Sequence, residues 1–196
     1  TWNQLGDDID GEAVNDDSGW VVSLSSDGKT VAIGSPGNGG TGTSSGHVRI
    51  YSYDDISSTW NQLGDDIDGE AADDYSGESV SLSSDGKTVA IGAPVNVGNG
   101  SFSGHVRIYS YDANNNSWNR LGDDIDGEAA GDQSGYSVSL SSDGKTVAIG
   151  APYNGGNGNN SGHVRIYSYD DISSTWSQLG DDIDGEAADN YSGESV

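Results

Sequence analysis

Residues 134–152 have the sequence SGYSVSLSSDGKTVAIGAP. Val138 and Leu140 alternate with serines in its first half, and Val147 and Ile149 alternate with small residues in its second half. A period of two is typical of half-buried β-strands. The Asp-Gly pair between the two halves supplies the positive φ angles that a tight turn needs. The stretch therefore predicts a β-hairpin.

The hairpin recurs along the chain at a constant interval. Closely similar stretches occupy residues 19–34 and 77–92, and another copy begins at residue 192. Tryptophan marks the same interval of 58 residues, at Trp2, Trp60, Trp118 and Trp176. A fixed period of this kind indicates a repeat architecture, in which each unit packs against its neighbours.

Each interval contains signals for about four strands and none for a helix. The clearest strand has the sequence GHVRIYSYD and occurs at residues 46–54, 104–112 and 162–170. Four antiparallel strands per unit is close to the size of a propeller blade, which is usually ~40–50 residues. We therefore predict an all-β fold of tandem four-stranded blades, either β-propeller-like or stacked in an open array. The predicted units are 2–59, 60–117, 118–175 and a partial unit at 176–196.

The composition of the chain limits its partners. Its 32 acidic and 7 basic residues give a formal net charge of −25. Binding to phosphate requires clustered Lys and Arg, so we expect no nucleic-acid partner, and cations are favoured instead. No apolar run approaches the ~18 residues of a membrane helix, which predicts no membrane insertion. The chain has no Cys, so disulfides do not stabilise the fold.

Three segments of the third unit carry a family resemblance: DQSGYSV at 132–138, VAIGAP at 147–152 and SGHVRIY at 161–167. Together they resemble an FG-GAP repeat, the blade of integrin-α-type β-propellers and of many secreted microbial and algal proteins. The resemblance implies an extracellular array of blades used for adhesion or scaffolding. The chain departs from the family at the phenylalanine before the glycine, which is replaced by Ser18, Ser76 and Ser134.

The hairpin loop is a second departure from the family. Integrin-type blades have a calcium loop of the type Asp-x-Asp-x-Asp-Gly at this point, whereas this chain has Ser-Ser-Asp-Gly-Lys. One carboxylate and a lysine do not make a calcium loop, so the resemblance places no calcium there.

The acidic loop after each tryptophan is the candidate metal site. Its sequence DDIDGE begins at Asp7, Asp65, Asp123 and Asp181. If the loop is extended, alternate carboxylates lie on one face, and calcium prefers six to eight oxygen ligands in a flexible loop. The alternative interpretation is that these charges are solvated and keep a repetitive β-protein soluble. The candidate calcium ligands are Asp8, Asp10, Glu12, Asp66, Asp68, Glu70, Asp124, Asp126, Glu128, Asp182, Asp184 and Glu186.

Two further residue types recur once per unit. A histidine precedes an arginine by two positions in the clearest strand, at His47, His105 and His163. A zinc site would need additional ligands from neighbouring blades, and the favoured interpretation is that His and Arg pair with the acidic loops between blades. The tryptophan could form a carbohydrate platform, but a packing anchor between blades is favoured.

Asn-x-Ser patterns predict glycosylation, and they occur at Asn99, Asn115, Asn159 and Asn190. No nucleophile elbow, ordered triad or phosphate-binding loop is present, so the sequence predicts that the chain is not an enzyme. We expect an extracellular structural or scaffold protein that forms a filament or surface layer by self-association of repeats or chains. The alternative is a ligand-binding propeller, an adhesin or lectin-like module that contacts glycans or cell-surface proteins.

Overall fold

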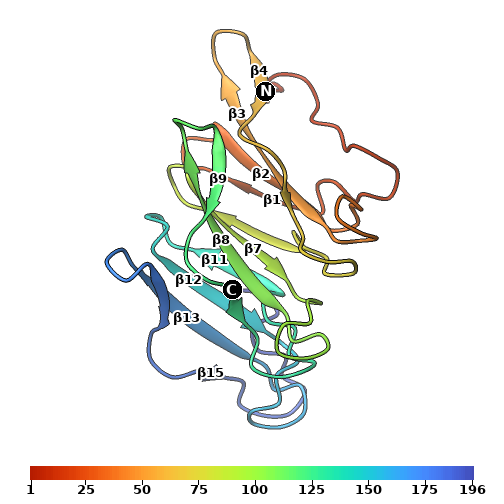
Figure 1. Ribbon diagram of the computed structural model, residues 1–196, viewed down its shortest axis with the longest axis vertical. Coiled ribbons are helices and arrows are strands. Elements are labelled where there is room, and N and C mark those ends of the chain that lie inside the picture. Colours follow the sequence, from red (N-terminus) through yellow and green to blue (C-terminus); the bar gives the residue numbers. More distant parts are fainter.

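The computed structural model describes all 196 residues, which form three stacked antiparallel sheets and no helix (Figure 1). The first sheet has the strand order β1-β2-β3-β4, and a short β5 also pairs with β3. Its strands are β1 (Val21–Leu24), β2 (Thr30–Ser35), β3 (His47–Asp54), β4 (Thr59–Gln62) and β5 (Ile67–Asp68). The predicted all-β architecture of tandem blades is confirmed.

The other two sheets repeat this topology. The second contains β6 (Ser79–Leu82), β7 (Thr88–Ala93), β8 (His105–Asp112), β9 (Ser117–Arg120) and β10 (Ile125–Asp126). The third contains β11 (Ser137–Leu140), β12 (Thr146–Ala151), β13 (His163–Asp170), β14 (Thr175–Gln178) and β15 (Ile183–Asp184). Each sheet thus begins within one predicted unit and takes its last two strands from the next unit, so the sheets are offset from the sequence units. The structure contains no helix long and apolar enough to cross a membrane.

The predicted hairpin is the edge of each sheet. In the third sheet β11 pairs with β12, and Val138 lies opposite Ile149. The turn between them has Gly144 at φ +71°, a left-handed conformation that glycine adopts without strain. The carboxylate of Asp143 accepts hydrogen bonds from the Ser141 hydroxyl at 2.6 Å and the Lys145 amide at 3.0 Å. The Asp-Gly pair therefore supplies both the turn geometry and a partner for the exposed amide.

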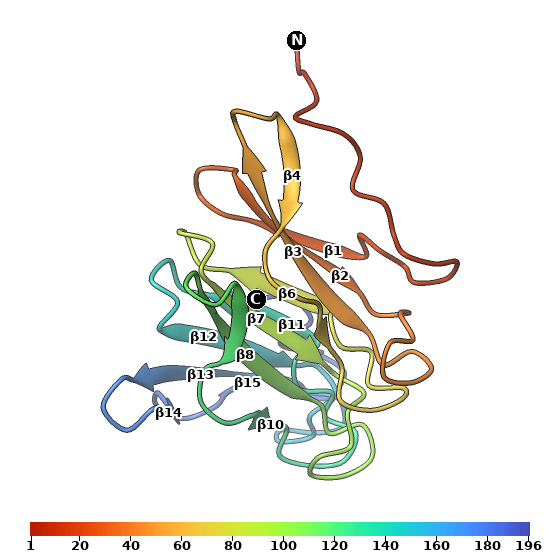
Figure 2. The same ribbon diagram turned by 45° about the horizontal axis from the view of Figure 1, so that its top comes forward.

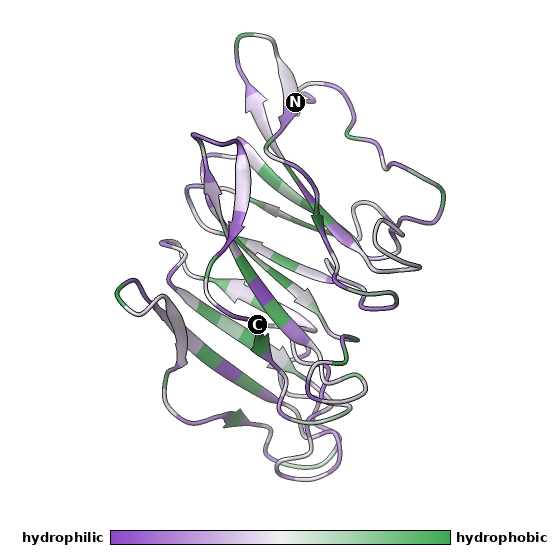
Figure 3. Cartoon of the chain, in the orientation of Figure 1, coloured by the Kyte–Doolittle hydropathy of each residue, from purple (hydrophilic) through white to green (hydrophobic).

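Thin apolar layers hold neighbouring sheets together. Figure 3 shows hydrophobic bands along the strands, where they alternate with hydrophilic ones, and few hydrophobic residues in the loops. Between the first two sheets, Val48 and Ile50 of β3 pack in one cluster with Val80 and Leu82 of β6. The backbones also approach closely, because a Cβ added to Gly92 would lie 2.0 Å from the carbonyl oxygen of Gly135 in the next repeat. Only glycine allows this contact between sheets.

The two end faces of the stack are incompletely covered. Val22 and Leu24 of β1 are 57% and 58% exposed, whereas their repeat equivalents Val80 and Leu82 are each 7% exposed. At the other end, Ile183 is 54% exposed. Residues 1–20 form no strand and run beside the first sheet (Figure 2). Within that segment, Ile9 packs against the apolar cluster of the first sheet and covers part of one end face.

Candidate functional site

Three clusters of one glutamate, one histidine and one aspartate recur at the 58-residue period of the chain. In each cluster the candidate ligand atoms lie within 4.8 Å of one another. We call them the first, middle and third histidine–carboxylate clusters: Glu12, His47 and Asp66; Glu70, His105 and Asp124; and Glu128, His163 and Asp182.

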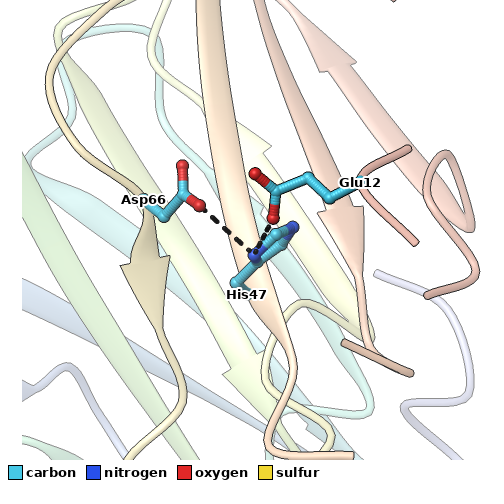
Figure 4. A group of neighbouring side chains, drawn as sticks. All are labelled: Glu12, His47 and Asp66. Atoms are coloured by element: carbon cyan, nitrogen blue, oxygen red, sulfur yellow. Dashed lines mark ion pairs between the residues drawn. The ribbon is translucent and has the colours of Figure 1, made fainter. Parts of the chain in front are cut away.

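The topology explains how each cluster assembles. His47 is the first residue of β3, and it pairs in register with Asp68 of β5. The edge of the sheet is broken between β4 and β5, where Gly64 has φ +68°, and Asp66 lies in this break. The glutamate comes from the segment before the sheet, so Glu12 approaches the histidine from the other side (Figure 4). Each cluster therefore joins one sheet to the segment that precedes it.

The first and third clusters have nearly the same geometry. The Nδ1 atom of His47 lies 3.6 Å from Asp66 Oδ2 and 3.9 Å from Glu12 Oε2. The corresponding distances at His163 are 3.5 Å to Asp182 and 3.9 Å to Glu128. A glutamine orients each aspartate from four residues earlier: the other carboxylate oxygen accepts a hydrogen bond of 2.6 Å from Gln62 or Gln178.

The histidine side chains are almost completely buried. His47 and His163 are each 1% exposed. The Nε2 atoms of His47 and His105 are buried without a hydrogen-bond partner. Burial lowers the pKa of His163, and the neighbouring Arg165 lowers it further. The imidazole of His163 is therefore neutral near pH 7, and a neutral imidazole is the form that ligates metals.

Each cluster lies beside a buried arginine. Arg49 donates from Nη2 to the backbone carbonyl of Asp10 at 2.7 Å, and its Nη1 lies 3.8 Å from Glu12 Oε1. Its guanidinium also lies over the Tyr51 ring, 5.7 Å from the centroid. Arg107 and Arg165 make the equivalent bond to Asp68 and Asp126. The interpretation that His and Arg pair with the acidic loops between blades is confirmed for Arg, whereas His47 and His163 lie near the carboxylates without hydrogen-bonding to them.

The middle cluster differs from the other two at one position. Arg120 replaces the orienting glutamine, and its Nη2 lies 2.9 Å from Asp124 Oδ1. Burial lowers the pKa of His105 to about 4, with smaller contributions from the positive charges of Arg107 and Arg120. Burial raises the pKa of Asp124. The middle cluster thus holds an additional positive charge where the first and third hold a neutral amide.

The structure distributes the carboxylates of the acidic loop differently from the expectation. Asp66, Asp68 and Glu70 were expected on one face, and this is wrong: Asp66 belongs to the first cluster and Glu70 to the middle cluster. Asp68 belongs to neither cluster; it is the last residue of the short strand β5. The candidate ligands outside all three clusters are Asp8, Asp10, Asp68, Asp126, Asp184 and Glu186. Calcium binding itself stays a prediction.

The histidines were the ligand-type residues that the calcium interpretation left out. Their signal in the sequence was a histidine at the start of the same strand in every unit. The predicted glycosylation acceptors Asn99, Asn115, Asn159 and Asn190 are exposed and lie outside the strands, and their use stays a prediction.

Trp60, Trp118 and Trp176 are packing anchors, as favoured from the sequence, whereas Trp2 is fully exposed. Trp118 packs against the cluster between the first two sheets, and its indole Nε1 donates to the Leu63 carbonyl at 2.8 Å. Its ring centroid lies 5.2 Å from that of Tyr111. An inter-repeat hydrogen bond of this kind fixes the distance between consecutive units.

A family comparison supports the sequence resemblance. Residues 125–167 match the model of the FG-GAP repeat. The match covers less than a quarter of the chain, and the fold as a whole is an array of β-propeller-like blades. No curated protein matches the chain.

Solved structures share the fold at low sequence identity. A candidate 6-phosphogluconolactonase from Bacteroides fragilis is 16% identical over 84% of this chain and 38% of that chain, with a TM-score of 0.56. A second from Bacteroides uniformis is 15% identical over 83% of this chain and 39% of that chain, with a TM-score of 0.56. Sqt1 from Saccharomyces cerevisiae is 15% identical over 85% of this chain and 36% of that chain, with a TM-score of 0.53. The chain spans well under half the length of these proteins, and the likeness shows the fold alone.

The comparison corrects the expectation that the chain is not an enzyme. Two structures with the same fold are candidate lactonases, so an array of such blades is compatible with catalysis. The sequence argument relied on the absence of a nucleophile elbow and a triad, which are only two of the ways to build an active site. At 16% identity the likeness assigns no particular reaction to this chain.

Proposed function

We propose that this chain is part of an extracellular scaffold in which blades extend through contacts with further blades of the same kind. The main support is the difference in side-chain exposure between the inner faces of the stack and its end faces. Leu24 is 58% exposed at one end, although Leu82 at the same repeat position is 7% exposed. The resemblance to blades of secreted proteins supports the extracellular location.

The two end faces are complementary in chemistry. Between the first two sheets, β6 contributes Val80 and Leu82, and the facing strand β3 contributes Val48 and Ile50. At the far end, Val164 and Ile166 of the third sheet occupy the positions of Val48 and Ile50, and both are only half-buried. The apolar residues of one end face could therefore pack against those of the other as Val80 and Leu82 pack with Val48 and Ile50. Such head-to-tail contacts are heterologous and produce either rings or open filaments.

Analytical ultracentrifugation over a concentration series tests this proposal. We expect the chain to associate as its concentration rises, and Leu24→Asp to suppress association by placing a charge on the end face. Ile56→Asp is the matched control, because Ile56 is 97% exposed in the loop between β3 and β4 and belongs to no apolar cluster. A chain that stays monomeric at every concentration, or equal effects of the two variants, would contradict the end-face contact.

A ring-shaped ligand-binding propeller is the second candidate. It is favoured by the fold that 84% of this chain shares, at a TM-score of 0.56, with a candidate 6-phosphogluconolactonase of β-propeller type. Negative-stain images of the associated species separate the candidates: rods or fibres support the scaffold, and discs support the propeller.

A further inference from the structure

We propose that the first and third histidine–carboxylate clusters each bind a divalent transition ion of the zinc type. The ligands would be the imidazole Nδ1 of His47 or His163 and one oxygen from each of the two carboxylates. The inference is independent of the self-association proposed above, because it concerns contacts within one chain.

The buried histidine distinguishes these clusters from ordinary acidic surface groups. His47 is 1% exposed, and its Nδ1 points between the two carboxylates (Figure 4). The distances of 3.6 and 3.9 Å to Asp66 and Glu12 exceed those of N–H···O hydrogen bonds, which are usually 2.7–3.2 Å. The Nδ1 atom of this buried side chain therefore lacks a hydrogen-bond partner, which is costly, and a metal ion between the two carboxylates would supply one.

The spacing of the ligand atoms suits a small four-coordinate ion. Zinc binds nitrogen and oxygen ligands at about 2.0–2.2 Å, so two ligands of a tetrahedral site are roughly 3.4 Å apart. The Nδ1-to-carboxylate distances exceed this by only a few tenths of an ångström in both clusters. Glu12, whose side chain is 46% exposed, can close the difference by a side-chain rotation. Three protein ligands leave the fourth position to water.

The ligand set favours a transition ion over calcium. Calcium takes six to eight oxygen ligands, whereas each cluster offers one nitrogen and two carboxylates. Imidazole suits zinc, copper and nickel. The second oxygen of each carboxylate already has a partner: Gln62 holds Asp66, and Arg49 lies 3.8 Å from Glu12 Oε1. These partners leave Asp66 Oδ2 and Glu12 Oε2 directed at the histidine.

The orphaned Nε2 of His47 limits the expected affinity. An imidazole that ligates through Nδ1 carries its proton on Nε2, where His47 has no acceptor. Loss of such a second partner typically lowers metal affinity by about 10–100-fold. We therefore expect weaker binding than at zinc sites with a fully hydrogen-bonded histidine.

The middle cluster serves as a control inside the same molecule. Arg120 lies 2.9 Å from Asp124 Oδ1, so its positive charge neutralises a required ligand and repels a cation. The middle cluster should therefore bind zinc more weakly than the other two. Arg120→Gln would introduce the glutamine that the first and third clusters have, and should create a third site.

Isothermal titration of the 196-residue chain with Zn²⁺ tests the proposal. We expect about two ions per chain in the wild type, three in Arg120→Gln, and one in Glu128→Gln. The matched control is Glu186→Gln, which removes the same charge at the same repeat position outside any cluster and should leave two. Circular dichroism verifies that each variant folds.

Three outcomes would overturn the proposal. The first is that the wild-type chain binds no more zinc than the triple variant Glu12→Gln, Glu128→Gln, Glu186→Gln, which lacks the glutamate of both proposed sites. The second is equal zinc stoichiometry in Glu128→Gln and Glu186→Gln, which would indicate diffuse binding to the acidic surface. The third is Ca²⁺ competing as strongly as Zn²⁺. Visible absorption of the Co²⁺-substituted chain typical of four-coordinate cobalt would support the proposal, and a spectrum identical to aqueous Co²⁺ would contradict it.

Discussion

Leucine occupies the same position in the first strand of all three sheets, yet its surroundings differ between the first and the second. Leu82 is 7% exposed in the cluster between the first and second sheets, and Leu24 is 58% exposed on the end face. Leu82→Ala removes buried methyl groups and leaves a cavity, which should cost about 2–5 kcal/mol of unfolding free energy. Leu24→Ala should change it by about 0.5 kcal/mol or less. The pair compares identical chemistry in two environments.

Urea unfolding, followed by tryptophan fluorescence and circular dichroism, measures the difference. For a loss of ~3 kcal/mol and a denaturant slope of ~2 kcal/mol per M, Leu82→Ala lowers the midpoint by about 1.5 M. Leu24→Ala should leave it nearly unchanged. Both probes must give coincident transitions, because cooperativity can break down in repeat arrays. Equal midpoint shifts for the two variants would refute the claim that stacking between sheets, and not the repeat position itself, stabilises the fold.

Two further predictions concern other contacts between the sheets. Gly92→Ala should lower the thermal midpoint strongly, because its Cβ would lie 2.0 Å from the Gly135 carbonyl oxygen. Gly155→Ala should leave the midpoint nearly unchanged, because the nearest atom to its Cβ would be 3.9 Å away. Equal midpoints for the two variants would contradict the close approach of the backbones. Burial holds the pKa of His105 at about 4, below its ordinary value of 6.5, so the unfolded state binds the proton first as the pH falls. His105 therefore does not reduce the free energy of unfolding above pH 6.5. Below that pH it reduces this free energy progressively, by roughly 3 kcal/mol near pH 4. His105→Gln should flatten that part of the stability profile, and an unchanged slope would show that His105 is protonated in the folded chain.

The sequence predicted the local structure well because that structure depends on neighbouring residues. The alternation at Val138 and Leu140 and the following Asp-Gly turn were sufficient for the hairpin. The constant period also implied that the units stack. The offset between sheets and units depends instead on the pairing of β4 with β3, which joins residues of two sequence units.

The sequence placed the histidines near acidic loops, but which carboxylates meet each histidine could not be predicted, because the members of a cluster are distant in the chain. Glu12, His47 and Asp66 meet only when the pairing of β3 with β5 and the position of the preceding segment are both known. The expectation for Asp66, Asp68 and Glu70 assumed one extended segment with a common face. Instead, the edge strand is interrupted before Ile67, so neighbouring carboxylates of one loop reach different sheets.

The dependence of each sheet on its neighbours is tested most directly by isolating one. A fragment spanning residues 76–126 contains the whole second sheet and neither adjacent sheet. We predict that this fragment shows no cooperative thermal transition by circular dichroism. Its NMR spectrum should lack the dispersed, sharp resonances of a folded protein, although the same residues are folded in the 196-residue chain. A monomeric fragment that unfolds cooperatively would contradict the account.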